Sequence, residues 1–151
     1  IYVEQENKEL GYVGKPKRVD AKLLREIIKE DFIPVIIPMG LDEKGIAYNI
    51  NADTAAGAIA TSIKSRRLML LTDIDGVLDN NEKLISEINI PQAKELINSE
   101  TIHGGMIPKV KTCIDAINNG VRAVVILDGR KSHSILFELF SDTGSGTLIR
   151  K

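Results

Sequence analysis

Short apolar runs recur along the chain, separated by stretches in which apolar and polar residues follow helical spacing. The runs Phe32–Ile37, Leu68–Leu71 and Ala123–Leu127 are rich in branched aliphatic side chains and end at Pro, Thr-Asp or Asp-Gly. Continuous apolar runs of this length between turn residues are typical of buried strands. The pattern therefore predicts three buried strands of a central sheet.

Amphipathic stretches between these runs predict helices. One begins at a capping Asp20, one at Pro91, one covers residues 106–117 and one covers residues 135–140. A hairpin over residues 1–13 and a closing strand over residues 147–149 complete the pattern. Alternating helices and buried strands predict an α/β protein, a three-layer αβα sandwich with a largely parallel central sheet. At 151 residues, we expect a single domain over residues 1–151.

Composition narrows the classes of function. Lys and Arg (20) balance Asp and Glu (21), aromatic residues make up 4% of the chain, and Trp is absent. Nucleic-acid surfaces need basic patches and stacking aromatics, so we expect no nucleic-acid partner. The single cysteine, Cys113, fits a reducing compartment, and we interpret it as a core residue. No apolar run is long enough for a membrane span, so the expected location is the cytoplasm.

A polar cluster opens the alanine-rich stretch Tyr48–Ala60. Asn49, Asn51 and Asp53 occupy alternate positions, so an extended or turning backbone would point their side chains to one side. The helix that follows offers free N–H groups and a partial positive charge, which favour an anion. The alternative interpretation is that Asn51 or Asp53 only caps this helix.

The apolar strand at Leu70 continues into the motif Thr72-Asp73-Ile74-Asp75-Gly76-Val77-Leu78. It is similar to the first motif of haloacid-dehalogenase-type phosphatases, in which the first aspartate attacks phosphorus. That family also needs a Ser or Thr after a second strand, whereas the run at Ala123–Leu127 ends in Asp128-Gly129-Arg130. The short motif therefore does not establish a phosphatase.

Five blocks in order resemble the carboxyl-terminal half of the N-acetylglutamate kinases, a family with the amino-acid-kinase fold. The blocks are Leu10–Gly14, Asn49–Asp53, Thr72–Leu78, Gly104–Val110 and Glu138–Thr147. The resemblance covers essentially the whole chain. It implies the nucleotide-binding half of that fold.

The activity implied by the resemblance is transfer of a phosphoryl group from ATP to the side-chain carboxylate of N-acetyl-L-glutamate, a step of arginine biosynthesis. Lys109 matches the family lysine that contacts the phosphates, and Asp53 matches the aspartate that holds catalytic lysines in place. Asp53 is not expected to act as a base, because the acceptor carboxylate is already ionised near neutral pH. Mg²⁺ is expected to arrive on the ATP phosphates, with no metal ligand from the protein.

The resemblance also assigns binding residues. Asn49 is expected to bind acetylglutamate, with Asn51 in support. Residues matched to the nucleotide site are Thr72, Asp73, Ile74, Asp75, Gly76, Val77, Leu78, Thr101, Ile102, His103, Gly105 and Met106. His103 has a second interpretation as an exposed loop histidine.

The family's amino-terminal half, with a further glycine loop and a second lysine, has no counterpart in these residues. We therefore expect a partial form that binds nucleotide and lacks turnover by itself; the full-length family forms homo-oligomers. Alternatives are a glutamate, aspartate, carbamate or uridylate kinase, or a non-catalytic nucleotide-binding remnant. In arginine-inhibited relatives the inhibitor contacts residues matched by Glu138 and Gly144, but the matching histidine is Val125 here, so inhibition is not expected.

Overall fold

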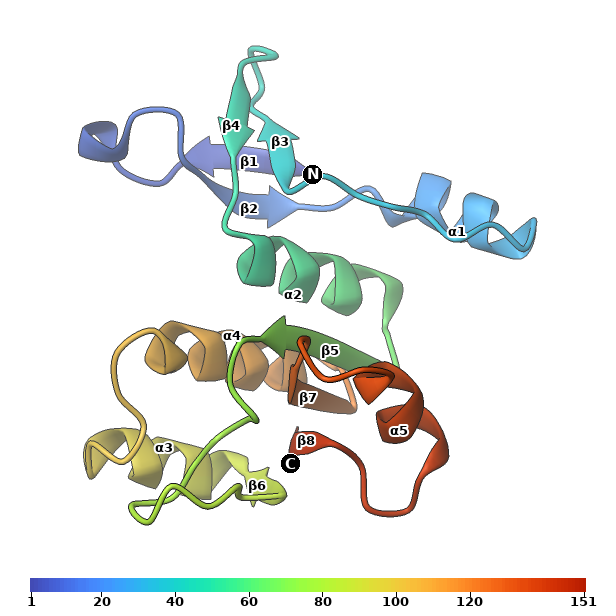
Figure 1. Ribbon diagram of the computed structural model, residues 1–151. Helices are drawn as coiled ribbons and strands as arrows, with labels where there is room; N and C mark the ends of the chain where they lie inside the picture. Colours follow the sequence, from blue (N-terminus) through green and yellow to red (C-terminus); the bar gives the residue numbers. More distant parts are fainter. The chain divides into compact units, whose positions relative to one another are not determined.

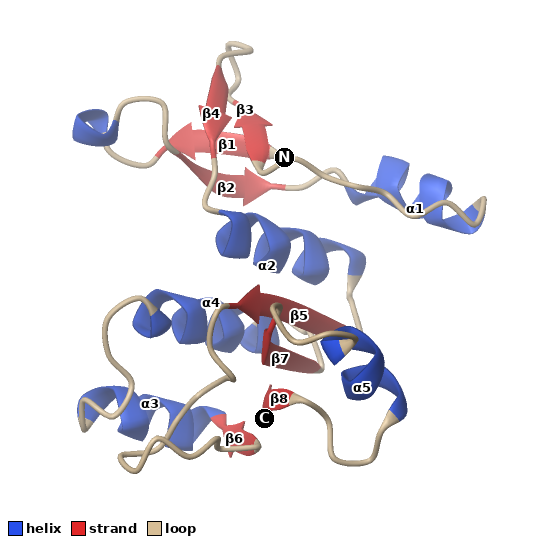
Figure 2. Ribbon diagram, viewed as in Figure 1, coloured by secondary structure: helices blue, strands red, loops and turns tan.

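The computed structural model describes all residues from 1 to 151 and divides the chain into two compact units, Ile1–Ser65 and Arg66–Lys151. Figures 1 and 2 show the helices and strands of each unit. Each unit contains its own four-stranded sheet.

The first unit has a sheet of strand order β2-β1-β3-β4. Its elements are β1 (Tyr2–Gln5), the 3₁₀ helix η1 (Lys8–Leu10), β2 (Gly14–Arg18), α1 (Ala21–Lys29), β3 (Met39–Leu41), β4 (Ala47–Asn49) and α2 (Ala52–Ile63). Strands β1 and β2 pair antiparallel, as do β3 and β4, because short connections allow only that direction. The expected hairpin is present, although its second strand lies later than residues 1–13 and includes the basic stretch after Val13.

A small apolar cluster holds the first unit together. Val3, Tyr48, Ile50 and Ala55 are buried, so strands β1 and β4 share a core with the first turn of α2. Gly40 makes this packing possible, because a Cβ there would lie 2.4 Å from a Val3 methyl group. The sequence pattern alone gave no sign of this close approach.

The expected helix after Asp20 is confirmed. The Asp20 carboxylate accepts a hydrogen bond of 3.1 Å from the Lys22 N–H, which caps α1. Arg25 donates to the carbonyl of Ser62 at 3.1 Å and so ties α1 to the end of α2. Helix α1 buries none of its residues.

The prediction of a buried strand at Phe32–Ile37 is wrong. These residues form no strand, and their apolar side chains are exposed, Ile33 by 89% and Val35 by 93%. Apolar composition gives a strand only where neighbouring strands accept its backbone hydrogen bonds. No strand of the first unit's sheet pairs with this run.

The second unit has the strand order β5-β7-β8-β6. Its elements are β5 (Arg67–Thr72), β6 (Glu87–Asn89), α3 (Ile90–Asn98), α4 (Met106–Asn118), β7 (Ala123–Asp128), α5 (Ser134–Phe140) and β8 (Gly146–Arg150). Residues Val124–Leu127 of β7 are fully buried. Helix α4 packs its buried face, centred on Val110, Cys113 and Ile117, against β7 and β8. Cys113 is buried, which confirms its interpretation as a core residue.

The α/β class is confirmed, but the expected single, largely parallel sheet is replaced by two sheets of mixed direction. In the second unit β5 pairs parallel with β7 and β6 parallel with β8, whereas β7 and β8 are antiparallel. Strand direction depends on which strands become neighbours, and apolar runs carry no information about that choice. The grouping of both units into one domain over residues 1–151 stays a prediction.

Matched isoleucine truncations test the exposure of the segment Phe32–Ile37. Ile33→Ala should change the free energy of unfolding by less than about 0.5 kcal/mol, because that side chain packs against little. Ile50→Ala should lower it by about 2 to 5 kcal/mol, because Ile50 is 1% exposed and its loss leaves a cavity. Urea unfolding of both variants measures the difference. Equal losses would contradict the structure of this segment.

Candidate active site

The parallel pairing of β5 with β7 brings the ends of two strands to one edge of the sheet. Thr72 lies opposite Asp128 in the register, and the Gly129 N–H donates to the Thr72 carbonyl at 2.9 Å. Polar residues follow both strands at this point, after buried apolar residues. Ligands of open α/β sheets bind beyond the carboxyl ends of parallel strands. This edge of the sheet is therefore the candidate location of a binding site.

The turn after β5 requires glycine at position 76. Gly76 has a φ of +149°, and a Cβ there would lie 2.6 Å from the Thr147 hydroxyl oxygen. Side chains rarely adopt such a φ, so a larger residue would meet both backbone strain and a clash. The turn then continues into a hairpin in which Ile85 N–H donates to the Val77 carbonyl at 2.9 Å.

Asp128, at the end of β7, is buried and held by its neighbour Arg130. The Arg130 guanidinium donates from Nε to Oδ1 at 3.0 Å and from Nη2 to Oδ2 at 2.9 Å, and its backbone N–H adds a bond of 2.8 Å. The guanidinium bonds first, and the backbone bond second, hold the pKa of Asp128 below its ordinary value of 3.8, although burial acts in the opposite direction. Asp128 is therefore a charged, fixed anchor of this edge.

A second ion pair joins the two loops at the edge. Lys131, which follows β7, lies 2.9 Å from Asp75 of the turn that follows β5. Both side chains are about half exposed, so the pair adds more to the placement of the loops than to stability.

The start of helix α4 forms the opposite wall. Gly104 has a φ of +55°, and the N-cap Gly105 makes no side-chain cap, with open space where a Cβ would lie. Lys109 lies in the first turns of this helix and is half-buried. A helix start without side chains lets a ligand approach its N–H groups and positive dipole.

Both walls line one cleft of about 700 Å³. Its lining residues are Thr72, Asp73, Ile74, Gly76, Val77, Leu78, Asp79, Glu82, Thr101, Ile102, His103, Gly104, Gly105, Met106 and Lys109. Every residue predicted for the nucleotide site is among them except Asp75, which pairs with Lys131 instead. His103 is exposed and its ring Nδ1 lies 3.3 Å from the Thr101 carbonyl oxygen.

The other predicted residues belong to the first unit. Asn49 ends β4, and its side chain is exposed. Asn51 is the N-cap of α2: its side-chain oxygen accepts from the Thr54 N–H at 3.1 Å, so the capping interpretation holds for Asn51. Asp53 lies in the first turn of α2 and is half-buried. The roles of these three residues, and the meeting of Asp53 with Lys109, stay predictions.

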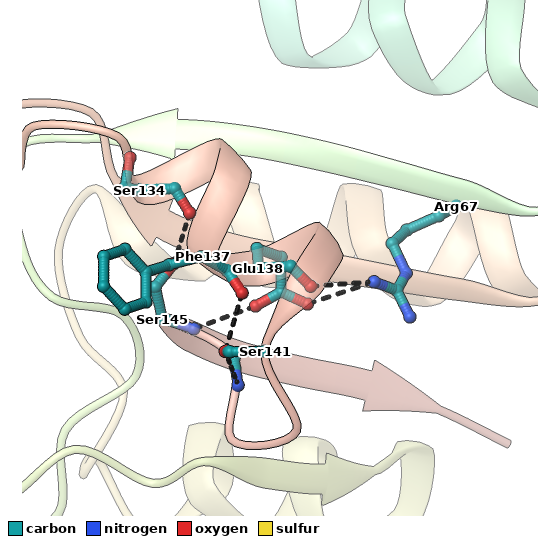
Figure 3. A network of polar contacts seen from close by, with 7 residues as sticks. Arg67, Ser134, Phe137, Glu138, Ser141 and Ser145 are labelled. Atoms are coloured by element: carbon teal, nitrogen blue, oxygen red, sulfur yellow. Dashed lines mark hydrogen bonds and ion pairs between the residues drawn. The ribbon is translucent and has the colours of Figure 1, made fainter.

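A separate polar network surrounds Glu138 on α5 (Figure 3). The buried carboxylate accepts from Arg67 at 3.3 Å and from the Ser145 N–H at 3.0 Å, while the Ser145 hydroxyl donates to the Ser134 carbonyl at 2.8 Å. Gly144 packs against Glu138 so closely that a Cβ would lie 2.6 Å from a carboxylate oxygen. The network fixes the loop between α5 and β8.

The side chains do not gather into a group suited to a metal ion: no cluster of three or more His, Cys, Asp or Glu residues has that geometry. None of the helices is long and apolar enough to cross a lipid bilayer.

The fold is that of an α/β protein with a cleft between the turn that follows a parallel strand and the glycine-opened start of a helix. Residues 1–128 match the model of the amino acid kinase family. The chain belongs to this family.

Individual relatives within this family give a more specific comparison than the family match. The chain is 60% identical over all of its 151 residues to the acetylglutamate kinase of Pelagibacter ubique (strain HTCC1062), and it covers 52% of that protein. It is 53% identical over 143 residues to the acetylglutamate kinase of Bradyrhizobium sp. (strain ORS 278), covering 95% of this chain and 48% of that protein. The chain thus spans about half the length of the curated relatives it matches.

Among solved structures, the chain resembles N-acetylglutamate synthase from Neisseria gonorrhoeae complexed with coenzyme A and L-arginine. The TM-score is 0.88 at 28% identity, over 94% of this chain and 33% of that one. The amino-acid-kinase fold expected from the sequence is confirmed.

Sequence reasoning missed the supporting residues of the cleft, above all Asp128, Lys131 and Thr147. Asp128 and Lys131 could have been found, because Asp128 ends a buried strand as Thr72 ends its own, and Lys131 lies in the turn that follows. Thr147 ends the fifth motif block, but nothing in the sequence indicated its contact with Val77, which lies 70 residues away.

The Asp128 anchor predicts a pH-dependent stability. Because its folded pKa lies below the unfolded value of about 3.9, the anchor stabilises the fold above pH 4 and this contribution is lost as pH falls through the folded pKa. Asp128→Asn should lower Tm near pH 7, and the gap from the unmodified chain should narrow below pH 4. Thermal unfolding from pH 7 to 3 measures it.

The matched control is Asp115→Asn, which changes an exposed aspartate of α4. It should shift Tm little at any pH. A gap for Asp128→Asn that stays constant down to pH 3 would refute the role given to the anchor.

Proposed function

We propose that this chain forms the nucleotide-binding part of an acetylglutamate kinase, which transfers a phosphoryl group from Mg-ATP to the side-chain carboxylate of N-acetyl-L-glutamate. The observation that carries the proposal is the single cleft in which Gly76, Gly105 and Lys109 come together from segments far apart in sequence. Membership of the amino acid kinase family and the 60% identity to an acetylglutamate kinase support it.

The cleft suits a nucleotide in size and in chemistry. Small-molecule sites usually enclose about 300 to 1,000 Å³, and this cleft, of about 700 Å³, lies within that range. The turn around Asp73 offers hydrogen-bonding groups for a ribose or base. The start of α4, with Gly104 and Gly105, offers backbone N–H groups to phosphate oxygens.

Lys109 supplies the positive charge that phosphoryl transfer requires. Such reactions depend on positioning and on neutralising charge over the transferred group, and need little covalent help. Lys109 stands in the wall that a triphosphate would face. A divalent metal, Mg²⁺ in this proposal, would arrive with the nucleotide and would supply further positive charge to the phosphates; no residue of this chain is assigned as its ligand.

The chemical step is a displacement at phosphorus. A carboxylate oxygen of N-acetyl-L-glutamate forms a bond to the γ-phosphorus while the bond from that phosphorus to the bridging oxygen breaks, and ADP leaves with the electron pair. The acceptor is already ionised near neutral pH, so no proton is removed. In this proposal Asp53 positions cationic groups, and Asn49 binds the acetylglutamate with an uncharged amide that does not repel the anion. The product is an acyl phosphate.

Nucleotide binding by the isolated chain is the first test. Mg-ATP should bind, and Lys109→Ala should weaken binding roughly tenfold or more, because hydrogen bonds to charged groups contribute about 1.5 to 3 kcal/mol. Lys111→Ala, two positions along the same helix and exposed, should change the affinity less than about twofold, as expected for a surface charge. Isothermal titration calorimetry measures both. Equal effects of the two substitutions would contradict the proposed site.

Turnover is the second test, and it needs a longer protein. A chimera should join this chain to the part of the Pelagibacter ubique relative that the chain does not match. We expect ADP release from this chimera that depends on N-acetyl-L-glutamate and falls at least about a hundredfold with Lys109→Ala, a loss of the order seen for transition-state donors.

Glutamate, aspartate, carbamate and uridylate serve as competing acceptors in the same assay. Faster ADP release with any of them than with N-acetyl-L-glutamate would overturn the assigned substrate and keep the kinase class. No ADP release with any acceptor, despite Mg-ATP binding, would favour a non-catalytic nucleotide-binding protein.

A further inference from the structure

Thr147 is a fully buried polar residue that lies outside the cleft. It is 0% exposed and is the second residue of β8, where it pairs with Ile126 of β7. It does not line the cleft. A buried hydroxyl needs hydrogen-bond partners, so the question is which groups it serves.

The hydroxyl sits between two backbone groups of the hairpin that follows the Gly76 turn. It accepts from the Val77 N–H at 2.8 Å and donates to the Ile85 carbonyl at 2.7 Å. The Ile85 N–H donates directly to the Val77 carbonyl at 2.9 Å. In the opposite direction, the Thr147 hydroxyl links the Val77 N–H to the Ile85 carbonyl at the base of the hairpin.

The same hydroxyl also explains the glycine at position 76. Its oxygen occupies the space where a Cβ of residue 76 would lie, at 2.6 Å. Gly76, Val77 and Ile85 are therefore all located by one side chain, which β8 holds against the rest of the sheet. Gly76 and Val77 both line the cleft.

We propose that Thr147 is a positioning residue for the nucleotide. Its hydroxyl bridges the backbone of Val77 and Ile85 in the hairpin, and so holds the Gly76–Val77 backbone in the conformation that binds the ligand. The inference rests on the proposed function, because it assigns this turn to nucleotide binding. It adds a residue that touches no ligand and acts only through the turn.

Three variants test the bridge made by the Thr147 hydroxyl. Thr147→Val keeps the shape and removes the hydroxyl, which leaves a buried N–H and a buried carbonyl without this partner. Thr147→Ser keeps the hydroxyl and removes a methyl group. Thr143→Val makes the same chemical change at an exposed loop position and serves as the control.

Two readouts separate positioning from general stability. Amide hydrogen exchange of Val77, measured by NMR without nucleotide, should accelerate about tenfold or more in Thr147→Val, the change expected for one buried hydrogen bond. The dissociation constant for Mg-ATP should rise by about the same factor. Thr147→Ser should restore both values to within about threefold of the unmodified chain, and Thr143→Val should leave them unchanged.

A further measurement needs no variant to fold. In the unmodified chain, saturating Mg-ATP should slow Val77 exchange more than exchange at Val124 of β7, because a ligand that binds this turn conformation stabilises it.

Each remaining outcome counts against the inference in a distinct way. Faster Val77 exchange with unchanged Mg-ATP affinity would make Thr147 a structural residue only. Unchanged exchange of the Val77 amide in Thr147→Val would show that the Thr147 hydroxyl does not hold the hairpin. If the unmodified chain binds no Mg-ATP, the proposed function fails and the positioning role falls with it, whereas Val77 exchange still reports the hydrogen bond.

Discussion

The parallel pairing of β5 with β7 is the constraint on which the candidate site depends. Its register sets Thr72 beside Asp128, so the turns after both strands leave the sheet at one edge. Strand β5 alternates the buried Leu68 and Leu70 with more exposed residues, so a slip of one residue would turn these two side chains toward water and make this register hard to change. The turn at Gly76, the ion pair of Lys131 with Asp75 and the anchor at Asp128 all follow from it.

Two carboxylates at this edge of the sheet are each paired with a cation. Lys131 lies 2.9 Å from Asp75, and Arg130 lies 2.9 Å from Asp128. Hydrogen bonds to Asp128 are the main cause that raises the pKa of Arg130 above its ordinary value, and the nearby charge of Asp73 acts in the same direction. These ion pairs orient the two loops, while the cleft itself is lined both by the acidic residues Asp73, Asp79 and Glu82 and by Lys109 near the glycine-opened start of α4.

The second unit was predicted well and the first unit less so. In the second unit, Leu68–Leu71, Ala123–Leu127 and residues 106–117 became β5, β7 and α4, because β7 pairs with β5 and packs against α4 and α5. Phe32–Ile37 is also an apolar run but is exposed instead. The chain spans about half the length of its relatives, and apolar composition cannot tell which neighbours a run will find.

The sequence by itself determined the α/β class and the strong local elements, and two of its motif blocks contain residues that line the cleft. Local patterns suffice for these because helical spacing, capping side chains such as Asp20 and glycines at turns act over a few residues. Only the tertiary structure decided that β8 runs antiparallel to β7, that Asp75 turns to Lys131, and that Thr147 supports the Gly76 turn. The contacts of Asp75 and Thr147 join residues 56 and 70 positions apart, and packing of the whole sheet selects them.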